Sequence, residues 1–364
     1  MQQCVKYLAK KLSESETVWL KKFEMKFGNY RIYNDIRNKS MKGIYFFCCD
    51  PNKDPVASGI FNQVINMYNL QETTHIFDNQ PVLKYVDLKG NEFLFAKTEE
   101  VLSHNYIKYL SQLEQLNDKY DFAGIVNWHE GKNAPNQILT VHTNSDVASG
   151  NFSTANPWLN RNIIQAIENN RLLAGLKEFS TKTEATHWSG VTYQQPAELI
   201  PQFTVPLVDI EIGSLPDSWS HPIAAEIIAT SLTQVFDKID QEEVMPILYI
   251  GGEHFDQDLT NIAINVNFPF AFCHHLPNQW FKDYAANQEV GFKYLTKCKD
   301  SIIGDLRAIF YHDGMSGPLK TMVKTFAEQH NIPVFKHKAL RDPDKLLKEL
   351  LSRSVSGSRP RPRV

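Results

Sequence analysis

The feature that most constrains this chain is a repeated alternation of short apolar runs with longer amphipathic segments. Runs such as 43–49, 122–128 and 245–250 have the length and composition of buried strands. The segments 56–68 and 158–179 have the spacing of apolar residues that is typical of helices packed on one face. This alternation predicts an α/β protein, a three-layer α/β/α sandwich with a mixed, mostly parallel sheet.

Proline positions refine these boundaries. Asp54-Pro55 precedes the first predicted helix and puts a proline in its first turn, where no helical hydrogen bond is lost. Pro206 lies in the predicted strand 204–213, so we expect an edge or a bulge there, because proline cannot donate to a ladder. The other predicted strands are 93–97, 137–142, 271–274, 306–312 and 334–336, and the other predicted helices are 101–116, 223–239, 290–299 and 318–330.

Composition fits an ordinary globular protein. With 364 residues, 42% of them hydrophobic and 22% charged, the chain has material for one large domain or two. No run approaches the roughly 18 to 20 apolar residues of a membrane helix, and the N-terminus is too polar for a signal peptide. We therefore expect a cytoplasmic protein without a membrane partner. The cysteines lack zinc-finger spacing and are expected to be reduced thiols in or near the core: Cys4, Cys48, Cys49, Cys273 and Cys298.

Charge divides the chain into three parts. Residues 1–42 carry ten Lys/Arg and four Asp/Glu, and residues 337–364 carry eight and three, although the whole chain has a net charge of −3. Basic ends on an acidic body suggest contact with a polyanion such as RNA, and solvated, partly helical appendages are the alternative. We expect a basic N-terminal extension (1–42), a folded body (43–336), and a basic C-terminal helix with a disordered tail (337–364).

Histidines cluster in short polar signatures at the ends of apolar runs. Imidazole is the side chain best suited to proton transfer or metal binding near neutral pH, and α/β proteins build sites at strand ends. The sequence therefore predicts chemistry at these positions. The signatures are Glu184-Ala185-Thr186-His187, Gly251-Gly252-Glu253-His254 and Phe272-Cys273-His274-His275-Leu276-Pro277, and His142 ends a fourth run.

Strand geometry and burial narrow the candidates. Neighbouring strand residues point to opposite faces, so only one of His274 and His275 can face a given cavity. Glu211 lies inside an apolar strand, so its carboxylate needs a partner, either a structural one or a site histidine or metal. The amides of Gly251-Gly252 either donate to a bound ligand or only permit a tight turn.

Several motifs occur in the order found in one enzyme family. They are Thr140-Val141-His142, Gly150-Asn151, Glu184 to His187, Ile210-Glu211-Ile212-Gly213-Ser214, Gly251 to His254 and His274 to Pro277. With Asp54-Pro55-Val56-Ala57-Ser58 and Asn127-Trp128-His129, this set resembles the archaeal- and plant-type D-aminoacyl-tRNA deacylases from about Gly43 to Lys336. The resemblance implies a fold similar to phosphorylases and peptidyl-tRNA hydrolases, hydrolysis of tRNA charged with a D-amino acid, and zinc as a cofactor.

The resemblance also implies roles for the residues of these motifs. Hydrolysis of an activated ester needs an oriented water, a proton acceptor and donors for the oxyanion, with a metal as an option. We expect catalysis by Glu184, His187, His254 and His274, and substrate binding by His129, His142, Asn151, Thr186, Trp188, Gly251 and Gly252. The metal ligands are undetermined, with His187, Glu211, His254 and His274 as candidates.

The chain departs from the family pattern in several places. Trp188 stands where the family commonly has a second histidine, and the segments between His142 and Gly150 and over 189–202 are longer than expected. Trp188 either stacks on the terminal adenine or the amino-acid side chain, or packs in the core. Two other functions stay open: a hydrolase or phosphorylase acting on a small molecule or peptide, and a non-catalytic RNA-binding relative.

Overall fold

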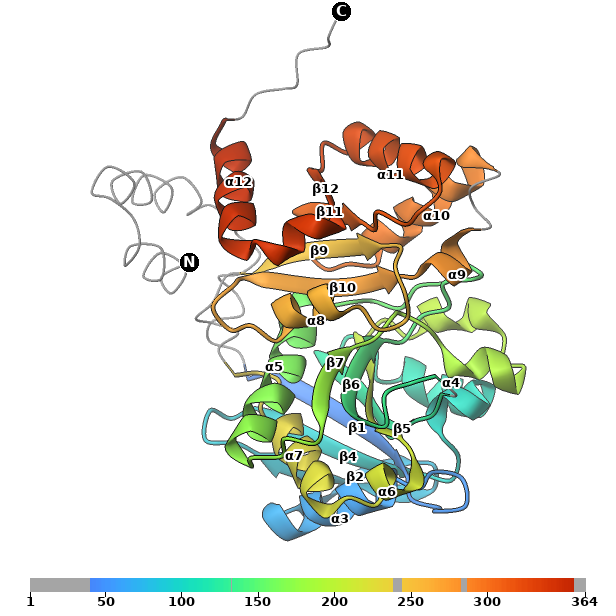
Figure 1. Ribbon diagram of the computed structural model, residues 1–364. Coiled ribbons are helices and arrows are strands. Elements are labelled where there is room, and N and C mark those ends of the chain that lie inside the picture. Colours follow the sequence, from blue (N-terminus) through green and yellow to red (C-terminus); the bar gives the residue numbers. More distant parts are fainter. Residues whose placement is uncertain (1–39, 132, 238–243, 283–286, 357–364) are drawn as a thin grey trace, which may run out of the picture.

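The computed structural model describes residues 40–131, 133–237, 244–282 and 287–356. These residues form two sheets, one of eight strands and one of four, which lie one above the other in Figure 1. The predicted extension 1–42 lies outside the described residues except for its last three positions, and so does the predicted tail beyond Ser356.

The larger sheet is mixed. Its strand order is β2-β3-β4-β1-β5-β8-β6-β7. Strands β4, β1, β5 and β8 are parallel, whereas β6 is antiparallel to β8, and β3 is antiparallel to β2 and β4. The strands are β1 (Lys42–Cys48), β2 (Gln71–Phe77), β3 (Gln80–Val86), β4 (Glu92–Thr98), β5 (Phe122–His129), β6 (Gln137–Thr143), β7 (Ser180–Thr183) and β8 (Leu207–Ser214).

Strand β1 shows why this sheet is covered on both faces. Tyr45 and Phe47 belong to the core under helices α3, α5 and α7, whereas Ile44 and Phe46 belong to the core under α4. All four are at most 1% exposed, so the predicted three-layer α/β/α arrangement is confirmed. The helices are α3 (Ala57–Met67), α4 (Tyr106–Glu114), α5 (Pro157–Leu173), α6 (Pro216–Trp219) and α7 (Pro222–Leu232), with 3-10 turns at η2 (Leu102–Asn105), η3 (Ser189–Tyr193) and η4 (Ala197–Gln202).

The smaller sheet is parallel throughout, with the order β10-β9-β11-β12. Leucines of α8 and α12 pack on one of its faces, and α10 and α11 cover the other. Its strands are β9 (Met245–Ile250), β10 (Phe270–Leu276), β11 (Ala308–Tyr311) and β12 (Val334–Lys336). Its helices are α8 (Gln257–Ala263), α9 (Asn278–Phe281), α10 (Gln288–Asp300), α11 (Gly317–Gln329) and α12 (Pro343–Ser356), with a 3-10 turn at η6 (His337–Arg341).

Helix α5 joins the two sheets. Arg161 Nη2 donates to the carbonyl of Phe268 at 3.0 Å, and Gln165 Nε2 donates to the carbonyl of Ala263 at 3.1 Å. These bonds fix α5 against the segment that connects α8 to β10. The carboxyl end of β7 and the loop after β9 are thereby brought to the same junction, where Ala185 N donates to the carbonyl of His254 at 2.8 Å.

The structure corrects several expectations about elements. The hairpin of β2 and β3 and the short helix α8 were not predicted, and the predicted helix 158–179 ends at Leu173. The expectation of an edge or bulge at Pro206 is wrong, because β8 begins one residue later and lies between β5 and β6. Pro206 uses only its carbonyl, which accepts a hydrogen bond from Ala123 N at 2.8 Å.

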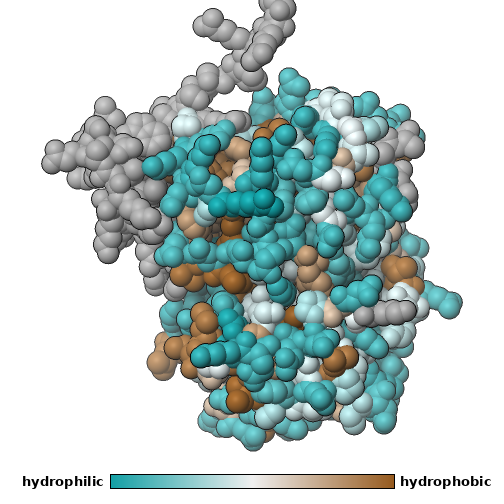
Figure 2. Space-filling view, viewed as in Figure 1, coloured by the Kyte–Doolittle hydropathy of each residue, from teal (hydrophilic) through white to brown (hydrophobic). Residues whose placement is uncertain are grey.

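The hydrophilic side chains at the surface and the free cysteines agree with what the sequence predicts. Figure 2 shows mostly hydrophilic side chains on one face, with apolar ones in small separate areas. Cys48, Cys273 and Cys298 are buried and free, and Cys49 is free and half-buried, whereas Cys4 lies outside the described residues. Among the described residues, no helix has both the length and the apolar character needed to cross a bilayer.

Candidate active site

Antiparallel strands β6 and β8 bring the first part of the site together. Their register sets His142 opposite Asp209 and Thr140 opposite Glu211. His142 Nε2 lies 3.5 Å from Asp209 Oδ2 and 3.6 Å from Glu211 Oε1, and all these side chains are buried. The buried Glu211, whose partner was undecided from sequence, therefore faces a histidine.

Asp209 is a site residue that the sequence analysis missed. Asn127 Nδ2 donates to its Oδ1 at 3.0 Å, and Asn144 Nδ2 donates to its Oδ2. Burial raises the pKa of Asp209 to about 6 and that of Glu211 to about 7. Burial would lower the pKa of His142, but its attraction to Glu211 and Asp209 raises it to about 10. Acidic residues at i and i+2 of an apolar strand share one face, and this signal could have revealed Asp209.

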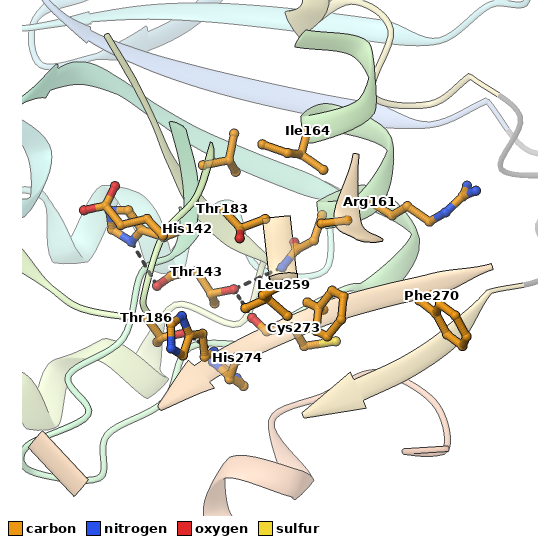
Figure 3. Close-up of a pocket in the computed structure, with 16 residues that line it drawn as sticks. His142, Thr143, Arg161, Ile164, Thr183, Thr186, Leu259, Phe270, Cys273 and His274 are labelled. Atoms are coloured by element: carbon orange, nitrogen blue, oxygen red, sulfur yellow. Dashed lines mark hydrogen bonds between the residues drawn. The ribbon is translucent and has the colours of Figure 1, made fainter. Parts of the chain in front are cut away.

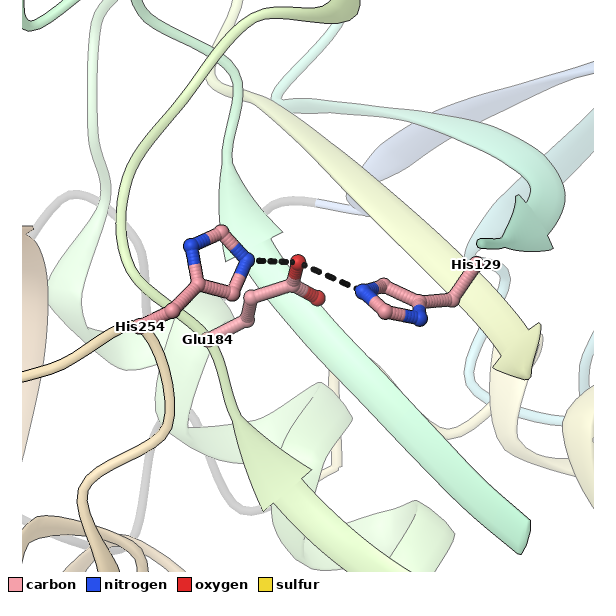
Figure 4. Close-up of side chains that lie close together, drawn as sticks. All are labelled: His129, Glu184 and His254. Atoms are coloured by element: carbon pink, nitrogen blue, oxygen red, sulfur yellow. Dashed lines mark hydrogen bonds and ion pairs between the residues drawn. The ribbon is translucent and has the colours of Figure 1, made fainter. Parts of the chain in front are cut away.

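Glu184, directly after β7, is the buried centre of the site (Figure 4). Its Oε1 lies 2.6 Å from His254 Nε2 and 3.2 Å from His129 Nε2, and its Oε2 accepts a hydrogen bond from Thr140 Oγ1 at 3.1 Å. Burial would raise the pKa of this carboxyl, but His129 and His254 outweigh burial and hold its pKa well below the usual range. Glu184 is thus an ionised carboxylate shared by two histidines.

His142 and His187 form a stacked pair, with ring centroids 3.9 Å apart and planes at 25°. Their Nδ1 atoms lie 3.2 Å and 2.9 Å from the carbonyls of Thr143 and Ala185. A carbonyl only accepts, so each Nδ1 carries a proton and each Nε2 faces the carboxylates. His187 Nε2 lies 3.8 Å from Glu184 Oε1. Burial and the charge on His142 lower the pKa of His187 to about 3, so His187 is a neutral imidazole.

His129 reaches the site from the end of β5. Its Nδ1 lies 2.8 Å from Ser214 Oγ, and that hydroxyl itself donates to the carbonyl of Pro135 at 2.8 Å. Ser214 therefore accepts and His129 Nδ1 donates. Burial would lower the pKa of His129, but Glu184 raises it above the usual value. The structure thus places His129 beside Glu184, whose carboxylate favours the protonated form of the imidazole.

Three overlapping groups of side chains in this cluster could hold a metal ion. In each group, the ligand atoms lie within 4.8 Å of one another. His142 Nε2 and Glu211 Oε2 are buried without a hydrogen-bond partner, and a cation beside them would satisfy both. The groups are His129-Glu184-His254, His142-Glu184-His187 and His142-Asp209-Glu211.

A fourth group, Asp256-His312-His337, lies in the loops after β9, β11 and β12. Its polar atoms already have partners. Tyr249 Oη donates to Asp256 at 2.6 Å, His337 Nε2 lies 3.3 Å from the same carboxylate, and Gly314 N donates to His312 Nδ1 at 3.0 Å. Because Nδ1 of His312 is an acceptor, its Nε2 carries the proton and is not available to a metal. This group is a structural network.

His274 was predicted in the site, but the structure does not bring it into the cluster around Glu184. Its Nε2 lies 2.9 Å from Ser301 Oγ and its ring packs edge-on against Phe152. Burial lowers its pKa to about 3. His274 does line a cavity of about 40 Å³ together with His142 (Figure 3), and Glu184 lines it as well. A cavity of that size has room for only a few water molecules.

Thr186 and the glycine pair serve the fold around the site. Thr186 N donates to the carbonyl of His275 at 2.9 Å, and His275 N donates back to Thr186 Oγ1 at 3.0 Å. Gly251 and Gly252 have φ values of +95° and +79°, which favour glycine. The Gly251 amide donates to the carbonyl of Leu276 at 2.7 Å, so it stabilises the turn. Of the two alternatives for this amide, the structure supports the tight turn.

Trp188 and Asn151 also lie outside the cluster. Trp188 is 4% exposed and packs edge-on against Tyr106, with centroids 5.6 Å apart. Asn151 Nδ2 donates to Ser149 Oγ at 2.8 Å, and its backbone pairs with Asp146. The core position of Trp188 leaves no face open for stacking on a base.

These features define an α/β protein with a buried histidine–carboxylate centre. A family model described as D-aminoacyl-tRNA deacylase matches residues 116–335, a segment that contains every residue of this centre. The chain belongs to this family, as its motifs predicted.

Individual comparisons agree with this assignment. The chain is 26% identical over 288 residues to the D-aminoacyl-tRNA deacylase of Pyrococcus abyssi, a match that covers 78% of this chain and 96% of the relative. It is 24% identical over 276 residues to the deacylase of Archaeoglobus fulgidus, covering 74% and 91%. A solved structure described as a conserved protein of unknown function has a TM-score of 0.64 at 20% identity, covers 84% of this chain and 98% of its own, and shows the same fold.

Proposed function

We propose that this protein hydrolyses the ester bond of D-aminoacyl-tRNA and releases the D-amino acid and the tRNA. The observation that carries this proposal is the convergence of three histidines on the buried carboxylate of Glu184, within the segment matched by the family model. Ester hydrolysis needs an oriented base and positive charge near the developing oxyanion, and this cluster supplies both.

His254 is suited to the proton transfers. Its Nε2 lies 2.6 Å from Glu184 Oε1, so it donates there and leaves Nδ1 of the neutral ring as the proton acceptor. Its side chain is 30% exposed, so water and substrate can reach it. His254 takes a proton from the attacking water, and Glu184 stabilises the resulting imidazolium. The proton then passes to the ribose oxygen as the bond between that oxygen and the acyl carbon breaks.

Positive charge for the oxyanion comes from two other histidines. Attraction to Glu211 and Asp209 raises the pKa of His142 to about 10 and keeps its ring protonated near neutral pH, and Glu184 raises the pKa of His129 above its usual value. Each is next to a buried carboxylate, which holds the charge in place. Charge that is fixed before the reaction stabilises a tetrahedral intermediate without reorganisation.

The cluster also fits zinc. The Nδ1 atoms of His142 and His187 donate to backbone carbonyls, which directs both Nε2 atoms toward Glu184 and fixes the tautomer that a metal ligand needs. Two imidazoles and one carboxylate are a donor set found in catalytic zinc sites. Bound there, zinc would polarise the ester carbonyl and lower the pKa of a water molecule. Zinc requires a neutral His142, so metal and proton compete for its Nε2.

Charged tRNA is the proposed partner, and the cytoplasm, where charged tRNA is used, is the proposed location. The basic segments 1–42 and 337–364 flank the proposed deacylase domain, 43–336, and are the proposed contacts with tRNA phosphates. Helix α12 presents Lys345 and Lys348 to solvent while its leucines pack on the smaller sheet.

Deacylation of D- and L-aminoacyl-tRNA by the wild-type protein and by His254→Ala tests the proposal. We expect ester hydrolysis by the wild type and a loss of about 10²- to 10⁴-fold in kcat for the variant, the usual contribution of a general base. Turnover of a small ester or nucleoside without turnover of charged tRNA would favour a different substrate class. Equal rates for the two proteins would remove His254 from the mechanism.

A further inference from the structure

Within the described part of the chain, His187 and His254 are the most exposed side chains of the cluster. The side chains of His254 and His187 are 30% and 23% exposed, whereas that of Glu184 is 0% exposed. His129 and His142 are also buried. A substrate therefore reaches the site over the exposed edges of His187 and His254.

Aromatic rings border this edge. The ring centroid of Trp280 lies 5.9 Å from that of His187 and 5.7 Å from that of His254. The Phe255 centroid lies 5.1 Å from that of His254 and 5.4 Å from that of His129. Trp280 and Phe255 are both half-buried, and Trp280 also packs against the core of the smaller sheet, so the described residues enclose neither side chain fully.

The backbone around Trp280 is fixed in place. Trp280 lies on the short helix α9, and Asn278 N at the start of that helix donates to the carbonyl of Gly252 at 3.1 Å. Phe281, next to Trp280, is 0% exposed and anchors α9 in the core of the smaller sheet. Trp280 is therefore held against the same loop that carries His254.

We propose that Trp280 is the platform on which the terminal base of the charged tRNA stacks, with Phe255 as the adjoining wall. This inference rests on the proposed deacylase function. The reacting ester is attached to the ribose of the terminal nucleoside, so the base lies one sugar away from the ester. A group that holds the base must lie beside the proton-transfer residue, and Trp280 lies beside His254. Stacking on an indole suits a single-stranded end, because it needs no base pairing.

The burial of Trp188 excludes it as the stacking residue. Trp188 is 4% exposed and its ring is covered by Tyr106 and the core around it. A base can stack only on an accessible ring face. We therefore assign to Trp280 the stacking role that the sequence suggested for Trp188.

The test compares two substrates that carry the same D-amino acid, the charged tRNA and the ethyl ester, which lacks the base. For Trp280→Ala we expect the ratio of kcat/KM for tRNA to kcat/KM for the ester to fall about 5- to 150-fold, the range for loss of one stacked base. The loss should appear mainly in KM for tRNA. Trp280→Phe, which keeps an aromatic face, should restore most of the ratio. Trp188→Phe serves as the control, because a core change alters both substrates alike.

Two results would overturn the stacking role of Trp280. A parallel loss on both substrates would mean that Trp280 only positions His187 and His254, and would overturn the stacking role. An unchanged ratio with unchanged rates would overturn it as well. If the wild-type protein hydrolyses the ethyl ester but no charged tRNA, the proposed function itself fails. If the wild type hydrolyses charged tRNA and Trp280→Ala does so at the same rate, only the stacking role fails.

Discussion

Replacement of Glu184 by Gln is the sharpest perturbation of the proposed centre. The carboxylate is fully buried and lies 2.6 Å and 3.2 Å from two histidine Nε2 atoms, with a third hydrogen bond from Thr140 at 3.1 Å. Glutamine preserves the volume but removes the charge and turns an NH₂ group toward one of these neighbours. His129 then loses its counter-ion in a buried site, and His254 loses the charged acceptor that orients its ring.

The structure sets the size of the effect. Removal of one partner from a buried charge pair costs about 3–5 kcal/mol of folding stability, and Glu184 and its partner His129 are both buried. Loss of the group that orients His254 should lower kcat for deacylation by about 10²- to 10⁴-fold. Denaturant unfolding measures the first quantity, and release of labelled amino acid from charged tRNA measures the second.

Glu253→Gln is the matched control. Glu253 precedes His254 but is exposed to solvent, so the same chemical change should alter stability by less than about 0.5 kcal/mol. If Glu184→Gln changes neither stability nor kcat more than Glu253→Gln does, Glu184 is not the charged centre of the site and the reasoning is refuted.

Three further predictions follow from particular residues. Burial raises the pKa of Asp54 to about 7, although hydrogen bonds from Ala57 and Val56 act in the opposite direction. The pKa in the folded state therefore exceeds that in the unfolded state, so the contribution of Asp54 to stability is lost as pH rises from about 4 to 7, and Asp54→Asn should remove about 4 kcal/mol of this pH dependence. A wild-type stability that stays flat over this pH range would contradict the prediction. Chelation should lower kcat and added zinc should restore it, and His187→Ala should reduce the zinc content measured by mass spectrometry; equal metal content in both proteins would exclude His187 as a ligand. Removal of residues 1–39, which spares Met41 and its bond to Asn91, should weaken tRNA binding and flatten its salt dependence, whereas an unchanged slope would exclude phosphate contacts by this segment.

Local patterns in the sequence predicted the architecture well. Apolar runs such as 43–49 gave strands buried on both faces, and alternation with helices gave the three layers. Strand β2 was not predicted because it is polar and largely exposed, as in the run Gln71-Glu72-Thr73-Thr74, and its partner β3 fully buries only Val82. Apolar periodicity cannot report a strand that lies at the edge of a sheet and buries little.

Only part of the site could be predicted from sequence, because some of its residues act through partners that the fold brings together. Strand-end histidines such as His187 and His254 could be recognised because their chemistry is local. The partners of Asp209 and His129 could not be predicted, because they depend on register: β6 runs antiparallel to β8, and β5 sets His129 beside Gly213. Glu184 and His254 are 70 residues apart in sequence and meet only where the two sheets come together.

Trp280 could not be identified from the sequence either. Burial decides whether an aromatic side chain packs in a core or offers a face to a ligand, and burial is a property of the folded chain. Trp188 has the more suggestive sequence position, next to His187, yet it is 4% exposed. Trp280 has no motif to mark it and borders the site through α9.

The most direct test of the central claim is a single-turnover time course of amino-acid release from D-aminoacyl-tRNA, run with the wild-type protein and with Glu184→Gln. We expect rapid release by the wild type and a rate at least about 10²-fold slower for the variant, since the base His254 loses the carboxylate that orients it. Release by the wild type at the spontaneous rate, or equal release by both proteins, would contradict the central claim.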